Sequence, residues 1–175
     1  MRRLLLLRHA KAERLQPGER DHDRRLAERG REDALQAGAY LSRHGDMPDQ
    51  VIVSPATRTR ETWELVAAGL TPQPPVVFEP RVYDASPETL LAIVQETAPG
   101  VRTLMMVGHN PGLHDLATHL IGTGDVDTRQ SLREAFPTCG LAIVEFAFDR
   151  WNRLHAQAGR LERFVTPRSI AAATD

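Results

Sequence analysis

The chain has 175 residues, 41% of them hydrophobic and 26% charged, with 22 Lys and Arg against 23 Asp and Glu. A chain of this length buries roughly two-thirds of its unfolded surface, which suits one domain with a sizeable core, and the composition excludes a disordered protein. The net charge of −1 excludes a general attraction to nucleic acid or to an anionic membrane.

The single cysteine and the N-terminus narrow the class of protein further. Cys139 alone excludes an internal disulfide framework and a zinc site built from several cysteines, and it indicates a reducing compartment. The N-terminal apolar run Leu4–Leu7 ends at Arg8 after four residues. A signal peptide needs roughly seven to fifteen apolar residues and a membrane span about 20, so we expect a soluble cytoplasmic protein.

The first part of the chain alternates short apolar runs with longer amphipathic ones. Leu4–Leu7 is typical of a parallel strand buried on both faces, and Arg31–Arg43 predicts a helix whose small residues allow close approach to a sheet. A second buried strand is predicted at Val51–Val53. Ser54 and Pro55 then predict the N-cap and the first position of the next helix.

The middle of the chain repeats this alternation. Val76–Phe78 and Thr103–Val107 predict two more buried strands. Ser86 and Asn110, each followed by proline, predict the N-caps of the helices that come after these strands. The polar stretch Gly122–Gln130 is predicted to be a long loop.

Two further strands are predicted towards the C-terminus, at Leu141–Phe148 and, at an edge of the sheet, at Leu161–Val165. Alternation of strands and helices implies right-handed crossovers and a mainly parallel sheet. The predicted fold class is α/β, a single three-layer domain whose mainly parallel sheet carries helices on both faces. We expect the domain to cover residues 1–170, with a flexible C-terminal tail at 171–175.

Three of the predicted strands end in polar residues that can carry chemistry. Arg8 and His9 follow the first strand, Arg58 lies just after the second, and His109 and Asn110 follow the fourth. Ligands bind beyond the carboxyl ends of the strands in open α/β sheets, so these groups are expected around one crevice. Guanidinium groups fork onto phosphate oxygens and helix N-termini favour anions, which predicts a site for a tetrahedral dianion. A single strand-end histidine is more often structural, but four such groups at three strand ends favour a functional site.

These segments resemble the motifs of the histidine phosphatase superfamily, which includes phosphoglycerate mutases and acid phosphatases. Leu6–Ala10 resembles its Arg-His-Gly signature, Ser54–Arg58 its second-arginine motif and Gly108–Pro111 its second-histidine motif. The similarity extends through Leu26–Gly30 and Arg81–Ala85 and so spans most of the chain. The short length and the Gly-His-Asn-Pro-Gly form look most like the SixA-type phosphohistidine phosphatases, which implies a phosphoglycerate mutase-like fold.

The resemblance also implies a mechanism. His9 would attack phosphorus in line and carry a transient phosphoryl group, which water would release as phosphate. Arg8, Arg58 and His109 would hold the phosphoryl oxygens while negative charge redistributes. No metal or other cofactor is required, because the side chains supply the positive charge. Asn110 is expected to cap its helix first and to line the pocket second.

Two positions depart from the family pattern. Ala10 stands where relatives usually have glycine, so a backbone conformation open only to glycine is not expected there. Many relatives place a general-acid glutamate after the third strand; here Glu79 and Asp84 are the nearest carboxylates, and Asp84 is the candidate acid. The alternative is that Asp84 is a charge at the N-terminus of a helix.

Three lesser candidates have simpler interpretations. Cys139 does not fit a Cys-x5-Arg nucleophile loop, because Glu145 occupies the position of the arginine, and it is expected to pack in the interior. The run Arg20–Arg25 is interpreted as a solvated surface, and Lys11 as a solvated loop residue that could attract an anion.

The predicted function is metal-independent hydrolysis of a phosphoramidate or a phosphomonoester through a phosphohistidine at His9, with phosphohistidine in a signalling protein as the preferred substrate. The short connection Glu79–Ser86, where larger relatives often carry lid insertions, predicts a pocket open to a histidine of another protein. A phosphatase for a small phosphorylated metabolite and a phosphate-binding or phosphoprotein-binding module without turnover remain alternatives, and the intact His9 favours an enzyme. The sequence leaves the oligomeric state open.

Overall fold

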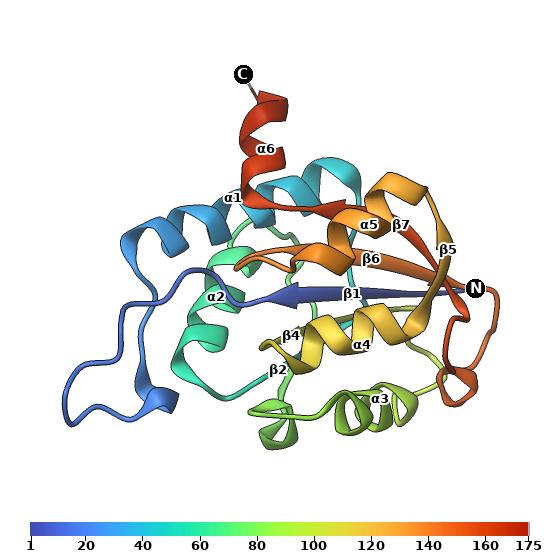
Figure 1. Cartoon of the computed structure of the whole chain (residues 1–175), viewed down its shortest axis with the longest axis horizontal. Coiled ribbons are helices and arrows are strands. Elements are labelled where there is room, and N and C mark those ends of the chain that lie inside the picture. The colour runs from blue at the N-terminus through green and yellow to red at the C-terminus, as the bar shows by residue number, and fades with distance from the viewer. Residues whose placement is uncertain (175) are drawn as a thin grey trace.

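A seven-stranded sheet runs through the centre of the structure, a computed structural model that describes residues 1–174 (Figure 1). The order of the strands in the sheet is β3-β2-β4-β1-β6-β7-β5. The strands are β1 (Arg2–Arg8), β2 (Gln50–Val53), β3 (Val76–Phe78), β4 (Thr103–Gly108), β5 (Ile121–Gly124), β6 (Leu141–Phe146) and β7 (Gly159–Val165).

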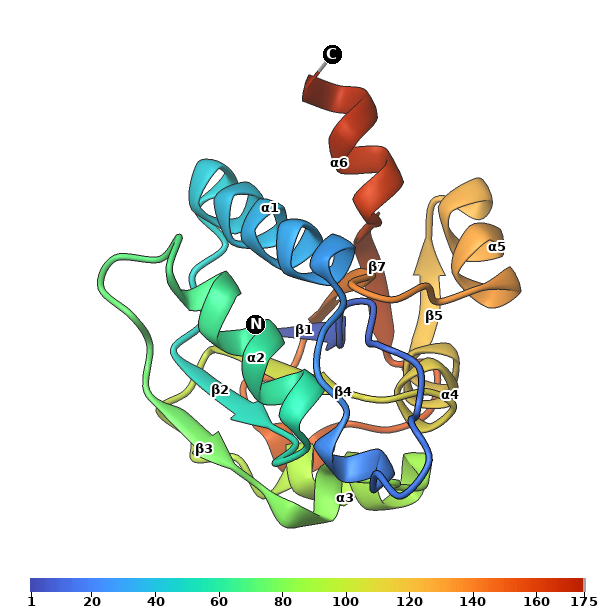
Figure 2. The same ribbon diagram turned by 90° about the vertical axis from the view of Figure 1, so that its left-hand side faces the viewer.

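Helices cover both faces of the sheet (Figure 2). The α-helices are α1 (Glu28–His44), α2 (Thr57–Ala67), α3 (Pro87–Gln95), α4 (Gly112–Leu120), α5 (Val126–Glu134) and α6 (Pro167–Thr174). Three short 3-10 helices lie in the connections: η1 (Asp21–Asp23), η2 (Pro80–Val82) and η3 (Trp151–Arg153). Buried residues of α1, α2 and α6 share one core, and those of α3, α4 and α5 share the other.

Pairing within the sheet is mainly parallel. Strand β4 pairs in parallel with β1 and β2, β2 pairs in parallel with β3, and β5 pairs in parallel with β7. Only β6 runs against its neighbours, β1 and β7. The predicted three-layer α/β architecture with a mainly parallel sheet is therefore confirmed.

The position of β1 between the two cores explains why its sequence is apolar without alternation. Leu4 and Leu6 point into the core beneath α3 and α4, whereas Leu5 and Leu7 point into the core beneath α1 and α2. All four side chains are fully buried. Burying a leucine side chain stabilises the fold by about 1.5–3 kcal/mol, so this short strand contributes to both cores at once.

The stretch Gly122–Gln130 is not the loop that its polar composition predicted. It contains most of β5 and the first half of α5, and the Asp125 side chain caps α5 by accepting the Thr128 backbone N–H at 2.9 Å. Strand β5 lies at an edge of the sheet, and α5 buries only Leu132. Elements with so little buried surface carry little apolar periodicity, which is why composition alone was misleading.

The two edges of the sheet also differ from expectation. Val76–Phe78 forms the predicted strand β3 but is not buried, because β3 is an edge strand whose three residues are 37–45% exposed. The segment Leu161–Val165 lies in β7, which is inside the sheet between β6 and β5 rather than at an edge. Strand β6 ends at Phe146, two residues before the predicted end.

The C-terminal segment continues in helix beyond residue 170. Helix α6 runs to Thr174 and packs Ile170 against the core on the α1 side, and Asp175 lies outside the described residues. No helix within residues 1–174 combines the length and the apolar character that crossing a membrane requires.

One of the three predicted helix caps is confirmed. The Ser86 hydroxyl accepts the Thr89 backbone N–H at the start of α3. Ser54 and Asn110 do not cap their helices, because α2 begins later, after Ala56, and α4 begins after Pro111. Both side chains bond instead to groups outside their own helices.

Helices α1 and α2 approach each other closely at Gly38. A Cβ atom added at Gly38 would lie 2.3 Å from the carbonyl oxygen of Val66 in α2. The small residues predicted in this helix therefore serve, at this position, to bring it close to another helix rather than to the sheet. Helix α2 carries Arg58, so this contact also helps to fix one side of the candidate site.

We predict that Gly38→Ala lowers the free energy of unfolding by about 1–3 kcal/mol, because the added methyl group meets backbone that cannot move away alone. Alanine is the better helix former by about 1 kcal/mol, so propensity alone predicts the opposite sign. Gly100→Ala is the matched control, since a Cβ there meets open space. Urea denaturation of the three proteins provides the comparison, and equal stability of Gly38→Ala and the wild type would contradict the packing argument.

Candidate active site

The two histidines lie side by side because of the register between β1 and β4. Arg8 is paired with Gly108, so His9 and His109 leave the sheet at the same level. The His9 backbone N–H donates to the Gly108 carbonyl at 3.1 Å, and the two ring centroids are 5.4 Å apart. Each histidine is only 8% exposed.

The two arginines approach the histidines from different elements. Arg8 is the last residue of β1, and its Nη1 donates to the Phe136 carbonyl at 3.1 Å. Arg58 lies in the first turn of α2 and is buried. Both guanidinium charges act on the His9 imidazole, and burial, followed by the Arg58 charge, lowers the pKa of Arg8. The structure thus brings the four predicted groups to the carboxyl end of β1, β2 and β4.

His9 is held as a neutral imidazole with one defined tautomer. Burial, together with the charges of Arg8 and Arg58, lowers the pKa of His9 to about 4. Its Nδ1 lies 2.7 Å from the Ala10 carbonyl oxygen. A carbonyl can only accept, so Nδ1 carries the proton and Nε2 keeps its lone pair.

His109 is also neutral and is bonded to a residue that the sequence analysis interpreted otherwise. Its Nε2 lies 2.7 Å from the hydroxyl oxygen of Ser54, the residue expected to cap α2. Burial, followed by His9 and Arg58, lowers the pKa of His109 to about 3. The sequence held one signal for a role of Ser54 in the site: Ser54 directly follows the end of β2, just as His109 directly follows the end of β4.

Several buried polar atoms of the site have no hydrogen-bond partner within residues 1–174. They are Arg8 Nε, Arg58 Nε, His109 Nδ1 and Asn110 Oδ1. Unpartnered buried polar atoms are uncommon, and three of these four belong to groups that can donate a hydrogen bond. This arrangement is suited to a compact ligand with several acceptor oxygens.

Asp21 and Tyr83 complete one wall of the site and were not singled out from the sequence. The Asp21 carboxylate accepts from Arg58 Nη2 at 3.0 Å and from the Tyr83 hydroxyl at 2.6 Å. These bonds hold the pKa of Asp21 well below its usual range. The Tyr83 and His109 rings pack at nearly right angles, with their centroids 5.5 Å apart. Asp21 belongs to the run interpreted as a solvated surface; its side chain is partly exposed, as that interpretation expects, but it is also bonded to Arg58 and Tyr83.

The remaining predicted residues are placed as follows. Asn110 donates through Nδ2 to the Phe136 carbonyl at 2.9 Å, the same oxygen that Arg8 contacts. Asp84 is exposed, and its carboxylate makes no hydrogen bond or ion pair with residues 1–174. Ala10 is fully buried without a positive φ, so alanine fits where relatives usually have glycine.

Metal-ligating and thiol groups contribute little to this region. Within residues 1–174 no three His, Cys, Asp or Glu side chains are grouped so as to hold a metal ion. Cys139 is buried as expected, its backbone N–H donates to the His9 carbonyl at 2.9 Å, and burial raises the pKa of its thiol to about 12.

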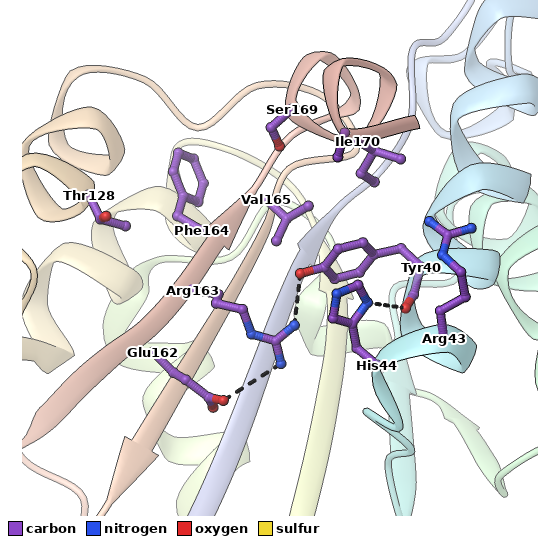
Figure 3. Close-up of a pocket in the computed structure, with 11 residues that line it drawn as sticks. Tyr40, Arg43, His44, Thr128, Glu162, Arg163, Phe164, Val165, Ser169 and Ile170 are labelled. Carbon is purple, nitrogen blue, oxygen red and sulfur yellow. Dashed lines mark hydrogen bonds and ion pairs between the residues drawn. The ribbon is translucent and has the colours of Figure 1, made fainter. Parts of the chain in front are cut away.

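A cavity of about 600 Å³ lies elsewhere, between α1, β7 and α6 (Figure 3). It contains none of the predicted site residues. Its central cation, Arg163, donates to the Tyr40 hydroxyl at 2.7 Å and pairs with Asp46 and Glu162. The charge of Arg163 is therefore neutralised by two carboxylates, so this cavity is a weaker candidate for an anion site than the strand ends.

Comparison with known proteins gives a consistent result. The profile of the histidine phosphatase superfamily (branch 1) matches residues 4–90. An uncharacterized protein of Mycobacterium leprae is 36% identical over 149 residues, which cover 85% of this chain and 89% of that protein.

Solved structures extend the similarity over nearly the whole chain. SixA of Agrobacterium tumefaciens is 32% identical with a TM-score of 0.81, over 95% of this chain and 98% of that one. SixA of Nakamurella multipartitia is 28% identical with a TM-score of 0.82, over 95% and 96% of the two chains. Both carry the name phosphohistidine phosphatase, and both confirm the phosphoglycerate mutase-like fold. The chain therefore belongs to branch 1 of the histidine phosphatase superfamily and is a phosphatase of the SixA type.

Proposed function

We propose that this phosphatase removes the phosphoryl group from phosphohistidine in other proteins, with His9 as the nucleophile and without a metal ion. The observation that carries the proposal is the pair of neutral, buried imidazoles beside the buried guanidinium of Arg58 and the partly buried guanidinium of Arg8. The two solved SixA proteins, which carry the name phosphohistidine phosphatase, support the choice of substrate.

In the first step, the lone pair on His9 Nε2 forms a bond to phosphorus as the bond to the leaving nitrogen breaks. The tautomer supports this, since Nδ1 carries the proton and Nε2 is free to attack. Arg8 and Arg58 would hold the phosphoryl oxygens, and charge spreads over those oxygens in the transition state. Water then attacks phosphorus, and inorganic phosphate leaves with His9 restored.

The leaving group explains why a strong general acid is not essential. A phosphohistidine ring can take a proton from solvent on its second nitrogen and then depart as neutral imidazole. Asp84 stays the candidate acid, but its exposed carboxylate without a hydrogen bond favours a lesser role. Asp21 is the carboxylate whose charge acts on His109, but its lowered pKa keeps it ionised and unable to donate a proton.

His109 is proposed to donate a hydrogen bond to the phosphoryl group through Nδ1. The Ser54 hydroxyl accepts the Ala56 backbone N–H at 3.4 Å, which leaves its own hydrogen for His109 Nε2. With Nε2 accepting, the proton of the neutral ring resides on Nδ1, the buried atom without a partner in residues 1–174. Ser54 would therefore select the tautomer that can bind an oxyanion.

The short connection between β3 and α3 supports a protein substrate. Only Glu79–Ser86 joins the two elements, and the segment holds one turn of 3-10 helix, η2. No inserted helical subdomain lies within this connection, which favours access for a histidine on a protein surface. A signalling protein as the partner and the cytoplasm as the compartment rest on the sequence analysis and stay part of the proposal.

Turnover of different phosphorylated compounds tests the substrate class. We expect phosphohistidine peptides to be hydrolysed with a kcat/KM at least about tenfold higher than sugar phosphates or phosphoglycerates, because an open site holds small esters by the phosphoryl group alone. Release of inorganic phosphate is the measurement. A clear preference for a small metabolite ester would contradict the proposed protein substrate and favour a metabolite phosphatase instead.

Trapping experiments test the nucleophile. After rapid quenching at high pH, the wild type should carry an acid-sensitive, labelled phosphoryl group taken from the donor. His9→Ala should carry none, and its turnover should fall by about 10³-fold or more. Asp84→Asn is the comparison, and we expect it to retain the label. Label that persists on His9→Ala would assign the phosphoryl group to another residue.

Nuclear magnetic resonance of ¹⁵N-labelled histidine tests the ring states. At pH 5.5 an ordinary imidazole, with a pKa of about 6.5, is about nine-tenths protonated. His9 and His109 should be neutral there, since their pKa values are lowered to about 4 and about 3, and each should carry its proton on Nδ1. Ser54→Ala should shift the His109 tautomer and lower kcat/KM by about 10- to 100-fold.

Assignment of these signals comes from their loss in His9→Asn and His109→Asn, and Ser42→Ala, an exposed serine of α1, is the control. Protonated rings at pH 5.5 in the wild type would refute the neutral pair, and an unchanged His109 signal in Ser54→Ala would refute the role of Ser54.

A further inference from the structure

A second hollow, of about 530 Å³, opens at the same end of the sheet as the active site. Figure 2 shows this end of the sheet, with β1 pointing towards the reader and α1, α5 and α6 arranged around the strand. The hollow lies between the start of α1, the segment that follows α5 and the start of α6. We call it the α6 groove.

The α6 groove and the active site share backbone. Lys11, which lines the groove, is two residues from His9, a separation of at most about 7 Å along the chain. Pro137 and Thr138 also line it, and they lie between Phe136, whose carbonyl accepts from Arg8, and Cys139, whose N–H donates to the His9 carbonyl. A chain segment bound at His9 therefore reaches the groove within a few residues.

The α6 groove combines an apolar floor with a cationic rim. Apolar atoms of Ala135, Pro137 and Phe164 face it. Lys11 and Arg168 are exposed at its rim, and neither forms an ion pair with any of residues 1–174.

Its only paired charges are Arg29 and Asp33, 3.2 Å apart, so the rim has three cations and one carboxylate. The cavity of Figure 3 differs in that Arg163, at its centre, is already bonded to Tyr40 and Glu162. An unneutralised cationic rim is complementary to an acidic partner.

We propose that the α6 groove docks an acidic segment of the phosphorylated substrate protein. An apolar side chain would pack on Phe164 and Pro137, and carboxylates next to it would pair with Lys11 and Arg168, within one or two helical turns of the phosphohistidine. The docking site rests on the proposed function, because it sets the substrate specificity of the same active site.

Two phosphohistidine peptides that differ only in their flanking charges test this proposal. One carries a leucine and glutamates within seven residues of the phosphohistidine, and the other carries lysines in place of the glutamates. Phosphoimidazole, which is too small to reach the groove, reports on the active site alone. We expect the wild type to hydrolyse the acidic peptide with a kcat/KM about five- to tenfold above that of the basic peptide, mainly through KM.

Arg168→Glu should abolish or reverse this preference and leave the turnover of phosphoimidazole unchanged. Arg102→Glu makes the same charge change at the opposite end of the sheet, just before β4, and should keep the preference. Ala135→Trp fills the groove at an exposed position and should lower kcat/KM for both peptides about fivefold or more without affecting phosphoimidazole.

The outcomes separate the docking site from the proposed function. A wild type that hydrolyses phosphoimidazole and both peptides equally well, or an Arg168→Glu variant that keeps the acidic preference, overturns the docking site and leaves the proposed function intact. A wild type that hydrolyses none of the three phosphoramidates overturns both. Added salt should reduce the preference of the wild type, since exposed charges are screened within about 10 Å at 0.1 M.

Discussion

Parallel pairing of β1 with β4 fixes in one step where both histidines leave the sheet. The pair Arg8 and Gly108 ends the ladder, and the next residue on each strand is a histidine. A shift of the register by one residue would turn every leucine of β1 towards the other core and would separate the two rings. The buried leucines on both faces of β1 therefore hold the geometry of the site as well as the stability of the sheet.

Positive charge is concentrated at this point at a considerable energetic cost, and the structure limits that cost in different ways. The two imidazoles stay neutral, Arg8 donates to a backbone carbonyl, and Arg58 pairs with Asp21. Some donors remain without partners, which is unfavourable unless a ligand accepts from them. The geometry is thus prepared for an anion before the anion arrives, as electrostatic catalysis requires.

Much of the fold was predictable because its central elements are strongly patterned. The apolar runs of β1, β2 and β4 predicted the strands correctly, and their polar ends predicted which residues meet. The edges were less predictable, since β5 and α5 bury few side chains and β3 is apolar yet exposed.

The finer structure of the site depends on contacts between distant segments, which local sequence does not report. A serine and an asparagine before prolines are strong cap signals, but Ser54 and Asn110 bond to His109 and Phe136, 55 and 26 residues away. Asp21 lies in a polar run that has no periodic pattern, and only the folded chain brings it to Arg58. Local signals therefore favoured capping for Ser54 and Asn110, which tertiary hydrogen bonds overrode, and gave no sign of the partners that Asp21 finds in the folded chain.

The buried Cys139 has a consequence for the chemistry of the whole protein. Enzymes that use a cysteine thiolate to accept phosphate lose activity when peroxide oxidises that sulfur. Here the one thiol of the chain is held protonated in the core, and the proposed nucleophile is a ring nitrogen. Dephosphorylation by this protein would therefore continue under oxidative stress that inactivates thiol-dependent phosphatases.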